Sequence, residues 1–180
     1  MVARPARSPR GRCSSKHREA VHAMAKQALT VLMGVPGSGK STLAESFDVP
    51  VVSLDAIRVG GRSASHVVNA AVRDVEQILA DGRSVLVDSC NLQPQIRLRW
   101  LRAGRKAGAR CELIVVETDR DLAIVRNRSR PERERVPDDA MLRYVARWPD
   151  ARDRARGEGW DRIRVVSGGE PLLGVRSREW

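Results

Sequence analysis

The hydrophobic positions of the chain fall into short apolar runs separated by segments with helical periodicity. Five β-rich runs are typical of buried strands, and four segments repeat apolar residues at helical spacing. The runs are Leu29–Met33, Val51–Leu54, Val85–Val87, Leu113–Val116 and Ile163–Val166, and the helical segments are 66–80, 94–107, 121–128 and 136–148. Strands that alternate with helices predict right-handed βαβ units. We therefore expect an α/β three-layer domain, with a five-stranded parallel sheet covered on both faces.

The composition adds a basic tail to this globular pattern. Hydrophobic residues make up 42% and charged residues 31% of the 180 residues. No apolar run approaches the roughly 20 residues that a membrane-spanning helix needs, so we expect a cytoplasmic protein without membrane contact. Residues 1–27 are predicted to form a disordered basic tail, and residues 28–180 the folded domain. The tail has no apolar signal segment, and Met24 is a possible alternative start just before the first strand.

The net charge of +11 favours a polyanionic partner such as nucleic acid. The tail contributes +6 of this charge, because it holds seven Lys or Arg residues and one acid. Nearly all the basic residues are arginines, so the codon bias of a GC-rich genome remains an alternative explanation. Cys13, Cys90 and Cys111 are odd in number and widely spaced. They indicate neither a disulfide framework nor a zinc site, and they fit a reducing cytoplasm.

A glycine-rich loop, GVPGSGKST at Gly34–Thr42, lies between the first strand and a helix-forming stretch. Its pattern and setting are those of a P-loop, in which glycines let backbone N–H groups converge on phosphate oxygens. We expect Lys40 to reach the β- and γ-phosphates of ATP, and the Ser41 hydroxyl to bind Mg²⁺. The predicted ATP-binding residues of the loop are Gly34, Pro36, Gly37, Ser38, Gly39, Lys40, Ser41 and Thr42.

P-loops occur in ATPases, GTPases and kinases, so the rest of the chain must indicate the acceptor. The NKxD signal by which GTPases read guanine is absent, and the chain is too short for a motor or an AAA⁺ module with a lid domain. A kinase that acts on a small molecule or on nucleic acid remains.

Two carboxylates end predicted strands and are candidates for the acceptor side. Asp55 ends the second strand, at the edge where open α/β sheets bind ligands, and can act as general base for an attacking hydroxyl. Arg58 follows one helical turn later and suits a phosphate. Asp88 ends the strand VLVD in the manner of a Walker B element, and could orient a magnesium-bound water or hold Arg58. The alternative for both carboxylates is an N-cap.

The loop after Asp88 and an arginine-rich segment complete the candidate site. Ser89 and Asn91 lie where an acceptor would bind, and we predict that they bind substrate together with Arg58 and Asp88. Five arginines occur between residues 126 and 135. They suit a lid over residues 126–136 that stabilises charge on the transferring phosphoryl group, although a solvated loop is the alternative reading of such a charge run.

These motifs together resemble the 5′-kinase domain of the phage polynucleotide kinase-phosphatases, an AAA_33-like P-loop kinase of the adenylate-kinase-like clan. The resemblance spans roughly residues 29–148. It depends on the P-loop, on Asp55 with Arg58, on VDSCNLQPQIRLRW, on RNRSR and on VPDDAMLRYVARW. No phosphatase domain is present, and Ser89 stands where the family commonly has threonine. Aromatic residues make up only 3%, so base stacking should contribute little.

The resemblance implies a role for each matching residue. Lys40 and Ser41 would bind ATP and magnesium, and Asp55 would activate the 5′-hydroxyl of DNA or RNA. Asp88 would support the acceptor site, while Arg58 would contact the acceptor end. The resemblance further implies that Arg130 contacts the donor phosphates, with Arg126 as a secondary candidate. The competing interpretations are a small-molecule kinase for a sugar acid, nucleoside or antibiotic, and a nucleotide-dependent binding switch.

Overall fold

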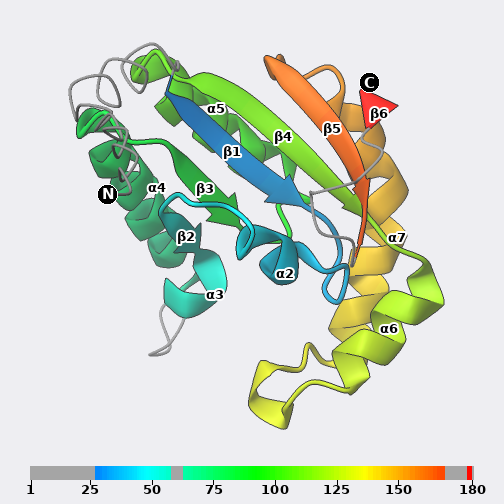
Figure 1. Cartoon of the computed structure of the whole chain (residues 1–180). Coiled ribbons are helices and arrows are strands. Elements are labelled where there is room, and N and C mark those ends of the chain that lie inside the picture. Colours follow the sequence, from blue (N-terminus) through cyan, green and yellow to red (C-terminus); the bar gives the residue numbers. More distant parts are fainter. Residues whose placement is uncertain (1–26, 58–62, 169–177, 180) are drawn as a thin grey trace, which may run out of the picture.

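The computed structural model describes residues 27–57, 63–168 and 178–179. Within them five parallel strands form one sheet, and a short antiparallel strand extends its edge (Figure 1). The strands are β1 (Ala28–Met33), β2 (Val51–Ser53), β3 (Val85–Asp88), β4 (Arg110–Glu117), β5 (Arg162–Ser167) and β6 (Arg178–Glu179). The predicted five-stranded parallel sheet is confirmed, with β6 as an addition. Apart from Gln27, the predicted basic tail lies outside the described residues.

The strand order places the end of β1 at a topological switch point. The sheet runs β2-β3-β1-β4-β5-β6, so the chain leaves β1 towards one edge and later returns to its other side at β4. In open α/β sheets the crevice beyond the carboxyl end of such a strand is where ligands bind. Figure 1 shows α2 (Lys40–Ala44), α3 (Leu54–Ile57) and α6 (Arg120–Arg128) on the side of the sheet where the carboxyl ends of the parallel strands lie.

The two faces of the sheet are covered unequally. The larger core packs one face against α4 (Ala64–Ala80), α5 (Pro94–Lys106) and α7 (Asp138–Ala155). On the opposite face the buried apolar residues of β1, β3, β4 and β5 pack against Leu43 and Ala44 of the short α2. The three layers are therefore present, but in the described part of the chain the second helical layer is thin: it consists of the five-residue helix α2.

The predicted helices occur where expected, with differences at several of their ends, such as the start of α7 at Asp138 and not at residue 136. The helix predicted at residue 66 begins at Ala64, because the Ser63 side chain caps it by accepting from the His66 N–H. The helix predicted to end at Trp148 continues through Pro149 to Ala155. No helix in the described ranges combines the length and hydropathy needed to cross a bilayer.

Candidate active site

The glycine-rich loop follows β1 and packs directly against α6. Gly37 and Gly39 adopt left-handed backbone conformations, with φ of 78° and 94°, which residues with a Cβ adopt only at a cost. A Cβ at Gly37 would also lie 2.3 Å from the carbonyl oxygen of Ala123 in α6. Position 37 therefore requires glycine for both conformation and space, and position 39 requires it for conformation.

Lys40 is the first residue of α2 and is nearly buried within the loop. Its Nζ donates to the Val35 carbonyl at 2.8 Å and to Ser38 Oγ at 3.3 Å. The Thr118 hydroxyl fixes the same loop by donating to the Ser38 carbonyl at 3.0 Å. The ammonium charge is thus held at the loop, where nucleotide phosphates would bind.

Ser41 and Asp88 meet beside the loop, the first on α2 and the second at the end of β3. The Ser41 hydroxyl donates to Asp88 Oδ2 at 2.9 Å. Hydroxyl and carboxylate oxygens are hard ligands, and Mg²⁺ commonly combines one or two of them with substrate phosphates and water. In the described part of the chain, no group of three or more His, Cys, Asp and Glu side chains could hold a metal. The residues fit a Mg²⁺ shared with a nucleotide.

This contact places Asp88 beside the donor-binding loop. The alternative reading of Asp88 as an N-cap is wrong, because α5 begins at Pro94 with Gln93 in the N-cap position. Its contact with an acceptor stays a prediction.

Asn91 has a different role from the predicted contact with the acceptor. It is 3% exposed, and its Nδ2 donates to the Leu32 carbonyl at 2.7 Å and the Ser89 carbonyl at 3.3 Å. Its Oδ1 accepts from Trp100 Nε1 at 3.0 Å. Because both amide hydrogens are used inside the fold, we correct the prediction: Asn91 shapes the loop after β3.

Cys90 lies among the charged groups that the sequence predicted for the site. Burial raises the pKa of its thiol above the ordinary value. The positive charges of Lys40 and Arg130 lower this pKa, and the negative charges of Asp55 and Asp88 raise it. Four charges from separate parts of the chain thus act on one sulfur atom. The thiol therefore lies within the electrostatic influence of Lys40, Asp55, Asp88 and Arg130.

Asp55 occupies the first turn of α3, directly after β2, and its side chain is exposed. The register pairs Ser53 of β2 with Asp88 of β3, so the two strands end side by side. Arg58 lies outside the described residues, and its role stays a prediction. The half-buried Ser89 directly follows Asp88.

The arginine segment, residues 126–136, is closed at its base by Asn127. This side chain is fully buried, donates to the Val136 carbonyl at 2.7 Å and accepts from the Val136 N–H at 3.1 Å. The Arg128 guanidinium pairs with Asp138 at 2.8 Å and lowers the pKa of that carboxyl. These contacts join the end of α6 to the start of α7 and leave a defined loop between them.

The arginines of this segment are not equivalent. Arg126 donates to the Gly168 carbonyl at 3.4 Å, Arg133 pairs with Glu134, and Arg135 donates to the Arg130 carbonyl. Arg130 is the member whose charge acts on the Cys90 thiol. Its contact with the donor phosphates stays a prediction.

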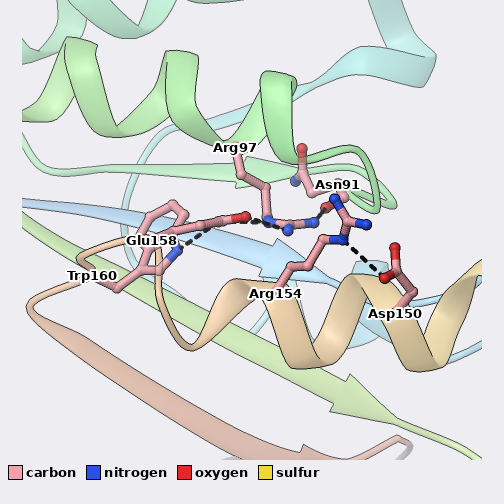
Figure 2. Close-up of polar contacts among 6 residues, drawn as sticks. All are labelled: Asn91, Arg97, Asp150, Arg154, Glu158 and Trp160. Carbon is pink, nitrogen blue, oxygen red and sulfur yellow. Dashed lines mark hydrogen bonds and ion pairs between the residues drawn. The ribbon is translucent and has the colours of Figure 1, made fainter.

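A buried polar network behind the site was not predicted from the sequence (Figure 2). Arg97 of α5 is fully buried and pairs through two nitrogens with Glu158, which lies just after α7. It also donates to the Asn91 carbonyl at 2.9 Å. One signal in the sequence could have indicated the burial of Arg97. Positions 97, 101 and 104 lie on one face of α5, and Leu101 and Gly104 are buried, so Arg97 is a charged residue at a core position.

Comparison with known protein families now places the chain. The model of the AAA_33 family, described as AAA domain, matches residues 29–155, from β1 to the last residue of α7. The chain belongs to this AAA domain family. No curated protein sequence matches it significantly. Together with the P-loop, family membership identifies a nucleotide-binding protein with a kinase-like fold.

Solved structures share the fold of this AAA domain protein at low sequence identity. A gluconokinase from Sinorhizobium meliloti is 19% identical with a TM-score of 0.56, covering 81% of this chain and 85% of its own. Kti12 from Chaetomium thermophilum, in complex with ADP-AlF3, is 18% identical with a TM-score of 0.59, covering 81% and 92%. A chain of a Pnkp1/Rnl/Hen1 complex is 20% identical with a TM-score of 0.51, covering 59% and 40%.

Proposed function

We propose that this AAA domain protein is an ATP-dependent kinase that phosphorylates the 5′-hydroxyl end of DNA or RNA. The observation that carries the proposal is the hydrogen bond of 2.9 Å between Ser41 and Asp88, beside the nearly buried Lys40. Asp55 directly follows β2, the strand that ends beside Asp88. Phosphoryl transfer needs positive groups around the transferred phosphate and a base for the acceptor. A nucleotide-dependent switch would have no need of that base.

In the proposed step, the acceptor hydroxyl gives its proton to the Asp55 carboxylate, and its oxygen forms a bond to the γ-phosphorus of ATP. The bond from that phosphorus to the β,γ-bridging oxygen breaks, and ADP leaves. Lys40 and Arg130 stabilise the negative charge on the transferring group. Ser41 and Asp88 would hold Mg²⁺, which neutralises charge on the β- and γ-phosphates.

The choice of a nucleic-acid end depends on charge and on the resemblance to the phage kinases. The net charge of +11 favours a polyanion, and the low aromatic content of 3% favours contacts to phosphates over base stacking. The gluconokinase that shares the fold makes a small alcohol the competing acceptor class.

The test is a transfer assay with γ-labelled ATP, Mg²⁺ and oligonucleotides of DNA and RNA that carry a 5′-hydroxyl. The same oligonucleotides with a 5′-phosphate are the matched control, and gluconate and nucleosides are offered in parallel. We expect label on the 5′-hydroxyl ends alone. Label on a small alcohol with none on any oligonucleotide would contradict the nucleic-acid assignment and keep the kinase assignment.

A further inference from the structure

The Arg97–Glu158 pair is buried without an obvious gain in stability. The Arg97 side chain is 0% exposed and that of Glu158 is 9% exposed. Removing two charges from water offsets much of their attraction, so a buried pair is weak evidence for a stabilising role. Glu158 also accepts from Trp160 Nε1 at 3.2 Å, which fixes the carboxylate from a second side (Figure 2).

Arg97 connects the fixed Glu158 carboxylate to the loop after β3. Its Nη1 donates to the Asn91 carbonyl, while Nε and Nη2 hold Glu158. Asn91 has a φ of 48°, the only positive value among non-glycine residues of the described chain. A left-handed asparagine needs contacts that hold it, and here its carbonyl and both ends of its amide are bonded.

The same loop is fastened to the P-loop at its other side. The Gly34 N–H donates to the Cys90 carbonyl at 3.1 Å, and Asn91 Nδ2 donates to the Leu32 carbonyl at 2.7 Å. The loop that starts at Asp88 is therefore held between β1 and Arg97. Because Asp88 binds Ser41 at 2.9 Å, a shift of this loop would separate the two oxygens suited to magnesium.

We propose that Arg97 and Glu158 are positioning residues that hold the Asp88–Asn91 loop, so that Asp88 and Ser41 form the magnesium site. The inference rests on the proposed function in one respect, that ATP and Mg²⁺ bind at the P-loop. Arg97 suits this position because its planar guanidinium holds the carboxylate through two nitrogens and the carbonyl through a third. The single ammonium nitrogen of a lysine lacks this fixed, spread geometry.

The experiment measures ATP affinity by calorimetry with Mg²⁺ and with EDTA, on the full chain. The double variant Arg97→Met/Glu158→Leu replaces the pair by apolar side chains of similar size, which proteins commonly tolerate. We expect unchanged affinity in EDTA and a loss of roughly tenfold in the gain produced by Mg²⁺, as for residues that orient metal ligands. Should the double variant not fold, Arg97→Lys is measured in the same way, and the same result is expected.

Arg105→Ala is the matched control. Arg105 lies on the same helix and reaches the same turn, donating to the Gly159 carbonyl at 2.6 Å and pairing with Asp161 at 3.3 Å, without a contact to Asn91. Its gain from Mg²⁺ should equal that of the wild type. Hydrogen exchange of the Trp100 indole N–H, which donates to Asn91, is measured in whichever variant folds. Faster exchange than in the wild type would show that the loop is released.

Three results would overturn the inference: a folded variant with the wild-type gain from Mg²⁺, an equal loss in Arg105→Ala, or no effect of Mg²⁺ on the wild type. None of them depends on the acceptor. Absence of transfer to oligonucleotides would therefore contradict the proposed function and leave this measurement interpretable.

Discussion

The P-loop packs against α6, and the arginine segment begins at the end of the same helix. The two regions differ in how firmly they are held. The P-loop is fixed along its length by main-chain contacts, glycine conformations and the nearly buried Lys40. The arginine segment is fixed at its base by Asn127, and its side-chain pairs lie at the surface. Surface pairs contribute little to stability, whereas a packed loop resists change. The P-loop is therefore preformed, whereas the arginine segment depends on few contacts.

The largest expected effect comes from Asp55, which belongs to neither region. Asp55→Asn should lower kcat by about 10²–10⁴-fold, because the amide cannot take the proton of the acceptor. ATP affinity should stay near that of the wild type, since Asp55 lies after β2 and not in the P-loop. The measurement is single-turnover transfer beside ATP binding. Transfer at a wild-type rate would show that another group is the base.

The second effect tests whether Arg130 acts in transfer and not in binding. Arg130→Ala should lower kcat by about 10³-fold, the range known for arginines that stabilise transferring phosphoryl groups. Arg133→Ala is the matched control, because its side chain is 85% exposed and pairs with the neighbouring Glu134. Equal losses in both variants would mean that the segment acts through its total charge alone.

The third effect measures how firmly the P-loop is fixed. Gly37→Ala adds both a left-handed strain and a clash with the Ala123 carbonyl, whereas Gly82→Ala adds the strain alone, because nothing lies within 4 Å of its Cβ. We expect Gly37→Ala to lower the free energy of unfolding by about 1–3 kcal/mol and to weaken ATP binding. Chemical denaturation of both variants gives the comparison. A smaller loss for Gly37→Ala than for Gly82→Ala would contradict the packing of α6 on the loop.

The smallest effect uses the Cys90 thiol as a reporter of the four charges. Because burial raises its pKa, less thiolate should form at pH 8.5 than in the unfolded chain, and alkylation should be slower. Asp55→Asn removes a charge that raises the pKa, so alkylation should become faster. Lys40→Met removes a charge that lowers it, so alkylation should become slower. Peptide mapping by mass spectrometry gives both rates, and shifts in the reverse directions would place these charges elsewhere.

The sheet and the donor loop were predictable because their signals are local. A buried strand shows as an apolar run, and a phosphate-binding loop needs glycine at positions such as Gly37. The continuation of α7 through Pro149 was not predictable in this way, since proline normally ends a helical pattern. Here Ala151 and Ala155, both nearly fully buried, pack against the core and extend the helix beyond it.

The positions of Arg97 and Asn91 could not be derived from the sequence for a related reason. The partners Arg97 and Glu158 are separated by 61 positions, and no local pattern connects them. Asn91 follows a predicted strand among polar residues, so its polar side chain suggested a ligand, whereas the fold uses it for main-chain carbonyls and an indole. The burial that distinguishes the two uses depends on tertiary packing.

Pro149 has a mechanical consequence for α7. The helix has 18 residues and is therefore roughly 27 Å long, with the arginine segment before its first turn and Glu158 just after its last. Pro149 cannot donate to the Val145 carbonyl, so the helix bends most easily there. Ala151 and Ala155 anchor the second part to the core. The first part of the helix is anchored as well, because Met141 is buried in the same core. The weak point at Pro149 therefore lies between two anchored parts of α7, the first beside the arginine segment and the second beside Glu158.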